Sequence, residues 1–206
     1  STGPTGTTGT GGVLGYYGLF AATTSQTNGG STTANVITFD TTIRNAQINI
    51  NSGTQVTFVN AGKYLITVET AFSNSTGSNP TVSIWIAQNG TNVANSAQDV
   101  QFFGGSGAVQ YSSCTWIIDA AAGDYIQCYW SCSGTTVSLA AQGTLTNPTR
   151  PASPAATLSA TQVMYTQLGP TGPTGPSAIT VGTTQVNSGN QYYVLYQDGE
   201  IGRAHV

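Results

Sequence analysis

Short runs of alternating apolar and polar residues occupy the middle of the chain and predict β-strands. Gly, Asn, Asp and Pro separate these runs, as they separate strands in β proteins, and no stretch of useful length has a helical period. In one run Val82, Ile84 and Ile86 share a face, and Trp85 lies on the other. The predicted strands are residues 16–23, 35–39, 55–59, 63–72, 81–88, 99–103, 109–118, 125–131, 136–141 and 156–165.

About ten short strands with turn residues between them predict an all-β fold, an antiparallel jelly-roll sandwich with short collagen-like flanking segments. The predicted segments are a collagen-like Gly/Thr segment at residues 1–14, the jelly roll at 15–168, a second collagen-like segment at 169–177, an extra strand segment at 178–199 and a tail at 200–206.

Glycine recurs at every third position near both ends of the chain, and the second run reads GPTGPTGPS. Only glycine fits at the crowded axis of a collagen triple helix, and proline favours the extended form of its strands. Three triplets are too few to hold a triple helix alone, so a flexible linker is the alternative. The glycines predicted to be collagen-like are Gly3, Gly6, Gly9, Gly12, Gly169, Gly172 and Gly175.

The segment 178–199 has strand propensity but is too short to form its own core. It must pair with a neighbouring subunit, with a following domain or with the jelly roll itself, because an unpaired strand edge is a liability. We favour the neighbouring subunit, where strand addition repeated head to tail produces an open filament. The residues of this predicted assembly strand are Ile179, Val181, Tyr192, Tyr193, Leu195 and Tyr196.

The tail at residues 200–206 has an unusual sequence. It back-translates as GAG ATC GGA AGA GCA CAC GTC, the start of a widely used sequencing-library adapter. We expect that the reading frame runs from an environmental DNA insert into adapter at this point. The single histidine of the chain, His205, then carries no functional meaning.

The chain has few charged residues, and this limits the classes of molecule that it can bind. Only 5% of residues are charged and the formal net charge is −3, whereas a typical soluble domain is about 25% charged. Four Lys and Arg residues cannot follow a phosphate backbone, so no nucleic-acid partner is expected. No apolar run is long enough for a membrane span. Weak electrostatic repulsion favours self-association, and we expect a homo-oligomer, either a trimer or an open filament.

The three cysteines, Cys114, Cys128 and Cys132, form neither an even disulfide framework nor a convincing metal site. Cys128 and Cys132 lie in one predicted strand, about 13 Å apart, which is too far for a bond. A hairpin of residues 114–130 would place Cys114 opposite Cys128. This leaves buried free thiols, which we favour, or a cross-strand disulfide.

Candidates for catalysis are weak, and no enzyme activity, cofactor or metal site is expected. Nucleophilic catalysis of the Ser-His or Cys-His kind needs a nearby base, and His205 lies in the suspect tail. Asp119 and Asp124 bracket a predicted turn, where Asp ordinarily forms the turn. A calcium site needs clustered oxygen ligands, and Asp40 and Asp99 alone do not supply them.

Four segments resemble strands of the tumour-necrosis-factor-like, or complement-globular-head, jelly roll. The likeness is greatest to versions in bacteriophage structural proteins and collagen-like bacterial surface proteins. It covers roughly residues 16–168 and implies trimers with a collagen-like stalk. The segments are AGKYLITVETAF (61–72), IWIAQNGTNV (84–93), AAGDYIQCYW (121–130) and ATLSATQVMY (156–165).

Two pairs of residues carry this resemblance most specifically. Gly62 and Tyr64 match the Gly-x-Tyr strand entry of the family, and Gly123 and Asp124 match its Gly-Asp turn. The chain departs from the family pattern because collagen-like triplets resume after the predicted head. This departure indicates a head within a longer fibre.

These patterns predict a structural subunit of an extracellular filament or virion fibre that assembles through its jelly roll and its flanking segments. The alternative is a trimeric adhesin or receptor-binding head that recognises a surface glycan. Aromatic side chains buried between subunits favour assembly. A solvent-facing aromatic groove at the apex of the head favours adhesion.

Overall fold

The computed structural model describes residues 15–103 and 105–163. The predicted collagen-like segments 1–14 and 169–177, the predicted assembly-strand segment 178–199 and the tail 200–206 lie outside the described residues. The predictions made for them therefore stay predictions.

The part of the chain that the structure describes contains β-strands and no helix that could cross a membrane. The strands are β1 (Tyr17–Ala22), β2 (Asn35–Val36), β3 (Thr41–Ala46), β4 (Ile48–Asn51), β5 (Gln55–Phe58), β6 (Gly62–Asn74), β7 (Thr81–Gln88), β8 (Thr91–Asn92), β9 (Gln98–Gln101), β10 (Val109–Ala120), β11 (Tyr125–Cys132), β12 (Val137–Leu139), β13 (Leu145–Thr146), β14 (Thr149–Arg150) and β15 (Ala156–Gln162).

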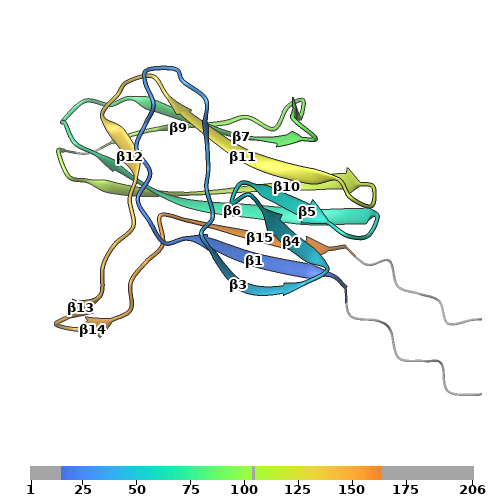
Figure 1. Cartoon of the computed structure of the whole chain (residues 1–206). Helices are drawn as coiled ribbons and strands as arrows, with labels where there is room; N and C mark the ends of the chain where they lie inside the picture. Colours follow the sequence, from blue (N-terminus) through green and yellow to red (C-terminus); the bar gives the residue numbers. More distant parts are fainter. Residues whose placement is uncertain (1–14, 104, 164–206) are drawn as a thin grey trace, which may run out of the picture. The chain divides into compact units, whose positions relative to one another are not determined.

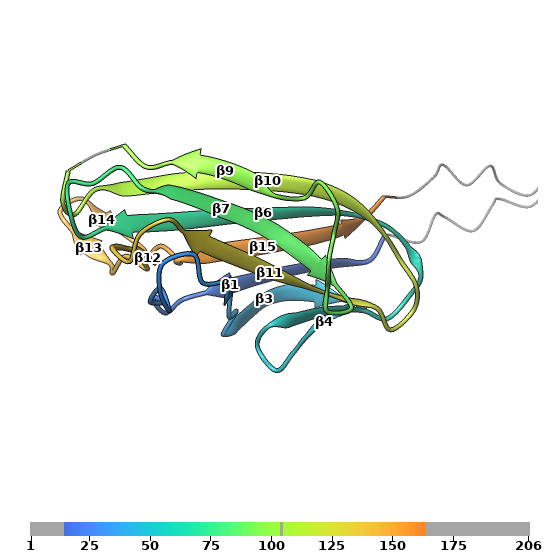
Figure 2. The same cartoon turned by 90° about the horizontal axis from the view of Figure 1, so that it is seen from above.

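Two antiparallel sheets pack face to face (Figure 1) and overlie one another when seen from above (Figure 2). The six-stranded sheet has the order β10-β6-β15-β1-β3, and β12 pairs with the end of β6. The seven-stranded sheet has the order β4-β5-β11-β7-β8, with β2 beside β11 and β9 beside β7. The chain changes sheet after β1, β2, β3, β5, β6, β9, β10 and β11, so the fold is the antiparallel jelly-roll sandwich that the sequence predicts.

Each predicted strand has a counterpart in the structure. The strands that were not predicted are β3, β4, β8, β13 and β14; of these β4 alternates, with Ile48 and Ile50 against two asparagines, but it is only four residues long. In β3 the first five residues are all exposed, because this strand forms an edge of the six-stranded sheet. Two features protect this edge from pairing with a further strand. One is the charge of Arg44, and the other is the shift of register in the β1–β3 pair between Leu19 and Phe20. The prediction therefore missed a strand that buries neither face.

The core lies between the two sheets. It consists of those side chains in each alternating run that point toward the opposite sheet, which we call the inward phase of the strand. In β11, Ile126, Cys128 and Trp130 are buried and the residues between them are partly exposed. Two aromatic contacts join the sheets across this core. Phe58 of β5 packs on Tyr64 of β6 with ring centroids 4.4 Å apart, and a second such pair is Phe72 of β6 and Trp130 of β11, 5.4 Å apart.

The predicted hairpin that would pair Cys114 with Cys128 is wrong. Strands β10 and β11 are consecutive but belong to different sheets, so Cys114 lies opposite Val68 and Cys128 opposite Ile86. All three cysteines are free and buried, which confirms the alternative that we favoured.

Both ends of the described chain lie on neighbouring strands. Tyr17 of β1 is opposite Thr161 of β15, and the backbone N–H of Gln162 donates to the carbonyl of Tyr16 at 2.8 Å. The chain therefore enters and leaves the sandwich at the same end.

A hairpin arm, residues 142–153, leaves the opposite end of the sandwich. At its root Gln142 and Ser153 exchange backbone hydrogen bonds of 2.8 and 2.9 Å, and beyond them β13 pairs with β14. Figure 1 shows the arm projecting on the side of the six-stranded sheet. We call this segment the arm.

The turn between β10 and β11 depends on a glycine. Gly123 has a φ of 88°, and its N–H donates to the carbonyl of Phe58 at 2.8 Å. A Cβ at this position would meet no atom within 4 Å, so a substitution there acts through backbone strain and not through a clash.

We expect Gly123→Ala to lower the free energy of unfolding by about 1 kcal/mol, because a side chain disfavours positive φ. The matched control is Gly77→Ala, where a Cβ also has open space but φ is not in the left-handed region. Chemical denaturation of both variants measures the difference. Equal stability of the two variants would contradict the role of φ.

Candidate interaction surface

Exposed apolar side chains gather on the outer face of the six-stranded sheet. Of the ten large apolar side chains exposed in the described residues, six lie on its strands and none on the strands of the seven-stranded sheet. Single exposed apolar residues are normal, but a group on one face marks an interaction surface. The six are Tyr17, Ile43, Leu65, Val109, Tyr111 and Ile117.

Cross-strand register places several of these side chains in one row. Ile117 lies opposite Leu65, Leu65 opposite Thr161, and Thr161 opposite Tyr17. Residues directly opposite in an antiparallel pair point to the same side of the sheet. Ile117 is 67% exposed, so this apolar row, residues 117, 65, 161 and 17, presents its methyl groups and ring to solvent.

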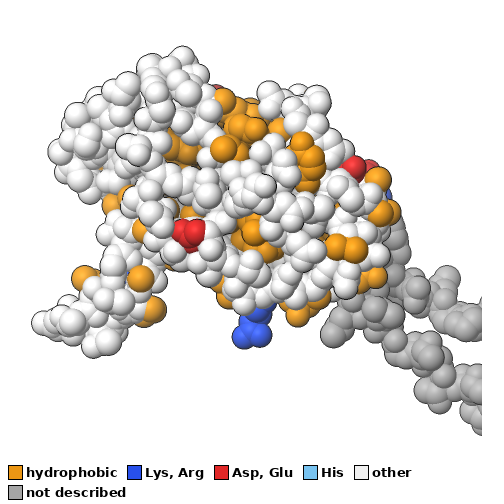
Figure 3. Space-filling view, in the orientation of Figure 1, with side chains coloured by type: hydrophobic (Ala, Val, Ile, Leu, Met, Phe, Trp, Pro, Cys, Tyr) orange, Lys and Arg blue, Asp and Glu red, His pale blue; other side chains and the backbone are white. Residues whose placement is uncertain are grey.

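Hydroxyl groups fill the middle of the same face and largely satisfy one another. The side-chain oxygens of Thr67 and Thr115 are 3.2 Å apart, and Ser159 lies opposite Thr67. In the next row Thr157 donates to Glu69 at 3.2 Å. The face is therefore nearly neutral, with one carboxylate near its centre, and Figure 3 shows few charged side chains on the view it gives.

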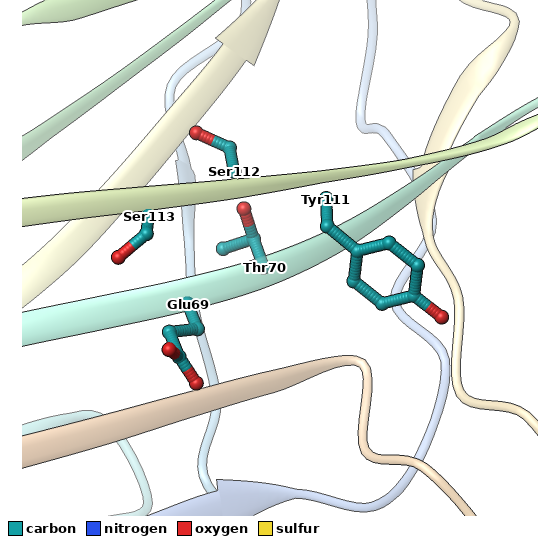
Figure 4. Close-up of a pocket in the computed structure, with 5 residues that line it drawn as sticks. All are labelled: Glu69, Thr70, Tyr111, Ser112 and Ser113. Atoms are coloured by element: carbon teal, nitrogen blue, oxygen red, sulfur yellow. The ribbon is translucent and has the colours of Figure 1, made fainter.

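A shallow groove runs beside that carboxylate. Glu69, Tyr111 and Ser113 extend to one side of β6 and β10, and Thr70 and Ser112 extend to the other (Figure 4). Three adjoining depressions have volumes of about 270, 170 and 190 Å³, below the roughly 300–1,000 Å³ of typical small-molecule sites. We call the part lined by Glu69, Ala71, Tyr111, Ser153, Pro154 and Thr157 the groove.

The charged side chains around this face are mostly satisfied within the chain. Lys63 and Asp119 form an ion pair at one end of the sheet. Asp124 accepts hydrogen bonds from Asn89, Ala121 and Gln88, and these hold its pKa below the ordinary value although desolvation acts the other way. Asp119 and Asp124 thus have structural partners, as expected for residues that bracket a turn.

Asp40 lies where the chain enters β3, and it accepts hydrogen bonds from the residues that follow β1 and from the first residue of β3. It accepts from the backbone N–H and hydroxyl of Thr23, from both corresponding groups of Thr24, and from the hydroxyl of Thr41. Desolvation alone would raise its pKa, but these hydrogen bonds together hold the pKa well below the ordinary value. The ionised carboxylate therefore stabilises the fold.

We expect Asp40→Asn to lower the free energy of unfolding by about 1 kcal/mol at pH 7, because charge-assisted hydrogen bonds are weakened. Since the folded-state pKa is depressed, the contribution is complete above the unfolded-state pKa of about 4 and is lost progressively as the pH falls from there through the depressed folded-state pKa. Urea denaturation at pH 7 and pH 2.5 should show the two proteins converging in acid. A difference that is unchanged at pH 2.5 would refute this.

No group of three or more His, Cys, Asp or Glu side chains in the described residues is arranged to hold a metal ion. Asp40 and Asp99, the oxygen ligands considered for calcium, lie on different sheets, and Ser83 donates to Asp99. Burial raises the pKa of the Cys114 thiol. It raises the pKa of Cys128 more strongly, and Cys114 adds an electrostatic contribution.

Because only the thiolate is a good nucleophile, we expect no labelling of Cys114, Cys128 or Cys132 by a maleimide reagent at pH 7 in the native protein. In denaturant all three should react. Mass spectrometry of the intact chain counts the adducts. Rapid native labelling at Cys128 would show that the core opens or that the thiol is exposed.

The sequence prediction located assembly on the jelly roll and its flanks but did not identify this face of the jelly roll. Its signal was present in the run 109–118, where Tyr111 and Ile117 are apolar at positions of the outward phase while Cys114 and Ile118 fill the inward phase. Exposed apolar residues on the outward phase of a strand, grouped with others on the same face, are typical of an interaction surface.

Comparison with protein-family models and with curated protein sequences finds no match. Among solved structures, the globular domain of zebrafish complement 1qA protein is similar, with 10% sequence identity and a TM-score of 0.44, covering 74% of this chain and 98% of that one. The assignment of the fold rests on the sheet order described above.

Proposed function

We propose that this chain is a self-assembling structural subunit of an extracellular filament or virion fibre. The observation that carries the proposal is the exposed apolar row on the six-stranded sheet, in which Ile117 is the most exposed large apolar side chain. Covering a large apolar side chain contributes about 1.5–3 kcal/mol. The low charge of the chain leaves little repulsion between copies.

The ends of the described chain support a particular placement of the sandwich in such a fibre. Tyr16 and Gln162 are hydrogen-bonded neighbours, so a fibre axis that enters before β1 would leave again beside it after β15. The sandwich then projects from the side of the fibre and does not lie in line with it. This geometry leaves the six-stranded sheet available to neighbouring sandwiches.

A three-fold arrangement fits the proposal best. Collagen-like triplets require three chains, and three sandwiches held by such flanks would meet at high local concentration. A contact between two different patches closes into a ring when the rotation allows it and otherwise continues as a filament. The subunit works by packing, without a catalytic step.

A second candidate function, recognition of a surface glycan, is favoured by one feature of the other sheet. Trp85 and Tyr129 stack on the outer face of the seven-stranded sheet with ring centroids 5.7 Å apart and planes 14° apart. Asn92 and Gln127 place amide groups beside them. Partly exposed aromatic rings next to polar groups are typical of recognition surfaces. This pair lies on a face that self-assembly does not use.

We expect Ile117→Lys to weaken self-association of the full chain at least about tenfold, because a charge replaces apolar burial at the interface. The matched control is Val59→Lys, at an exposed position outside the six-stranded sheet. Sedimentation velocity over a micromolar concentration series measures both. The wild-type chain should form trimers or larger species.

A monodisperse wild-type monomer would overturn the proposal, and so would equal effects of the two lysine variants. The experiment also separates the two candidate functions. A glycan-binding head does not need the six-stranded sheet, so the monomeric Ile117→Lys variant should keep any glycan binding that the wild type has.

A further inference from the structure

We propose that the arm, residues 142–153, docks on the six-stranded sheet of a second copy of this chain, where Arg150 pairs with Glu69 of the groove. This contact presupposes the self-assembly proposed above and names the element that holds neighbouring copies together. It requires an arm without a binding partner in its own sandwich, a groove that accepts it, and charges that match.

The arm has little to stabilise it within its own sandwich. Residues 143–149 are all exposed, and Leu145 is 45% exposed. Beyond the Gln142–Ser153 bridge, only β13 and β14 pair with each other. An isolated two-stranded hairpin is marginally stable in water at best, so a projecting arm of this kind gains most from a surface supplied by a partner.

The groove lies at the root of the arm, on the same side of the sandwich. Ser153 and Pro154 line it together with Tyr111 and Thr157. Figure 3 shows the arm standing clear of the body of the sandwich, with a hollow between the two. A second copy placed against the six-stranded sheet would therefore meet both the groove and the arm.

Charge identifies which residues meet. Within the described residues Lys63 and Asp119 form the one ion pair, which leaves Arg44 and Arg150 as cations without an acidic partner there. From the part of the chain that the structure describes, Glu69 accepts one hydrogen bond, which Thr157 donates. The other carboxylates of the described residues have hydrogen-bond donors in their own chain. Asp40 and Asp124 each accept from several donors, and Asp99 accepts from a residue of the neighbouring strand β7.

Covering the six-stranded sheet makes a cation necessary. A carboxylate buried at an interface without a partner is strongly destabilising, and Glu69 stands near the middle of the face that assembly would cover. A guanidinium binds a carboxylate through two parallel hydrogen bonds. Arg150 lies near the exposed tip of the arm, and among the described residues it donates one hydrogen bond, to the adjacent Pro151 carbonyl at 3.3 Å.

Arg44 is the competing cation. It lies on β3, opposite Leu19, and so belongs to the same sheet as Glu69. Two copies that pack sheet against sheet could bring Arg44 to Glu69 without the arm. The arm is the better source because it also carries the exposed Leu145, which can cover the apolar side of the groove beside Tyr111.

Charge reversal in the full chain tests the contact. We expect Glu69→Arg and Arg150→Glu each to weaken self-association at least about tenfold, because each leaves like charges facing one another. The double variant E69R/R150E should recover to within about threefold of the wild type, since the pair is restored in the opposite sense. Arg44→Glu is the matched control and should leave association unchanged. Sedimentation velocity measures all four, and circular dichroism checks that each is folded.

Three outcomes would overturn the arm contact. The double variant recovers nothing, or Arg44→Glu rescues Glu69→Arg in place of Arg150→Glu, or the single reversals have no effect. If the single reversals have no effect while Ile117→Lys still dissociates the assembly, the sheet interface stands and the arm contact fails. A monomeric wild-type chain would remove the proposed function as well.

A covalent trap gives an independent readout. A Glu69→Cys chain mixed with an Arg150→Cys chain under mild oxidation should form a cross-linked dimer, because the three native cysteines are buried. A mixture of Glu69→Cys with Arg44→Cys should not. Equal cross-linking in the two mixtures would contradict the contact, and cross-linking in the Arg44 mixture alone would assign it to Arg44.

Discussion

The packing of two sheets against each other is the constraint on which the rest of the structure depends. Phe58 on Tyr64 and Phe72 on Trp130 are contacts between residues of opposite sheets, and each ring is buried. Because these rings must meet, the inward phase of every long strand is fixed. The outward phase is then free to vary, and it differs between the two sheets.

The outer faces of the two sheets differ in how many large apolar side chains they expose. The seven-stranded sheet carries no large exposed apolar side chain on its described strands, whereas the six-stranded sheet carries several, together with Glu69 near its middle and the Lys63–Asp119 ion pair at one end. Because the chain has few charges, long-range electrostatic forces neither oppose nor direct an encounter between two copies. The difference in exposed apolar side chains between the two faces then matters more for association. The arm adds the cation that a covered Glu69 requires. The apolar row lies toward the chain ends, and the charge pairing lies toward the arm, on the same face of the sheet.

Hydrogen bonding compensates for the scarcity of ion pairs. Asp40 gathers donors from three threonines, and Asp124 gathers them from the β7–β8 turn and its own turn. Each carboxylate ties together loops that are distant in sequence. A chain rich in Thr, Asn and Gln can therefore position its loops with neutral donors where other proteins use lysine and arginine.

The sequence by itself determined the long core strands, because the alternation of Val82, Ile84 and Ile86 against Trp85 is a local property of one pleated strand. The turn at Gly123 and Asp124 was equally readable, since positive φ favours glycine. Only the tertiary structure decided which strands pair. It put β10 and β11 in different sheets, so Cys114 and Cys128 are not cross-strand partners, and it left β3 exposed at an edge. Strand pairing depends on contacts between residues far apart in the chain. The pattern within a single strand does not indicate which strand lies beside it.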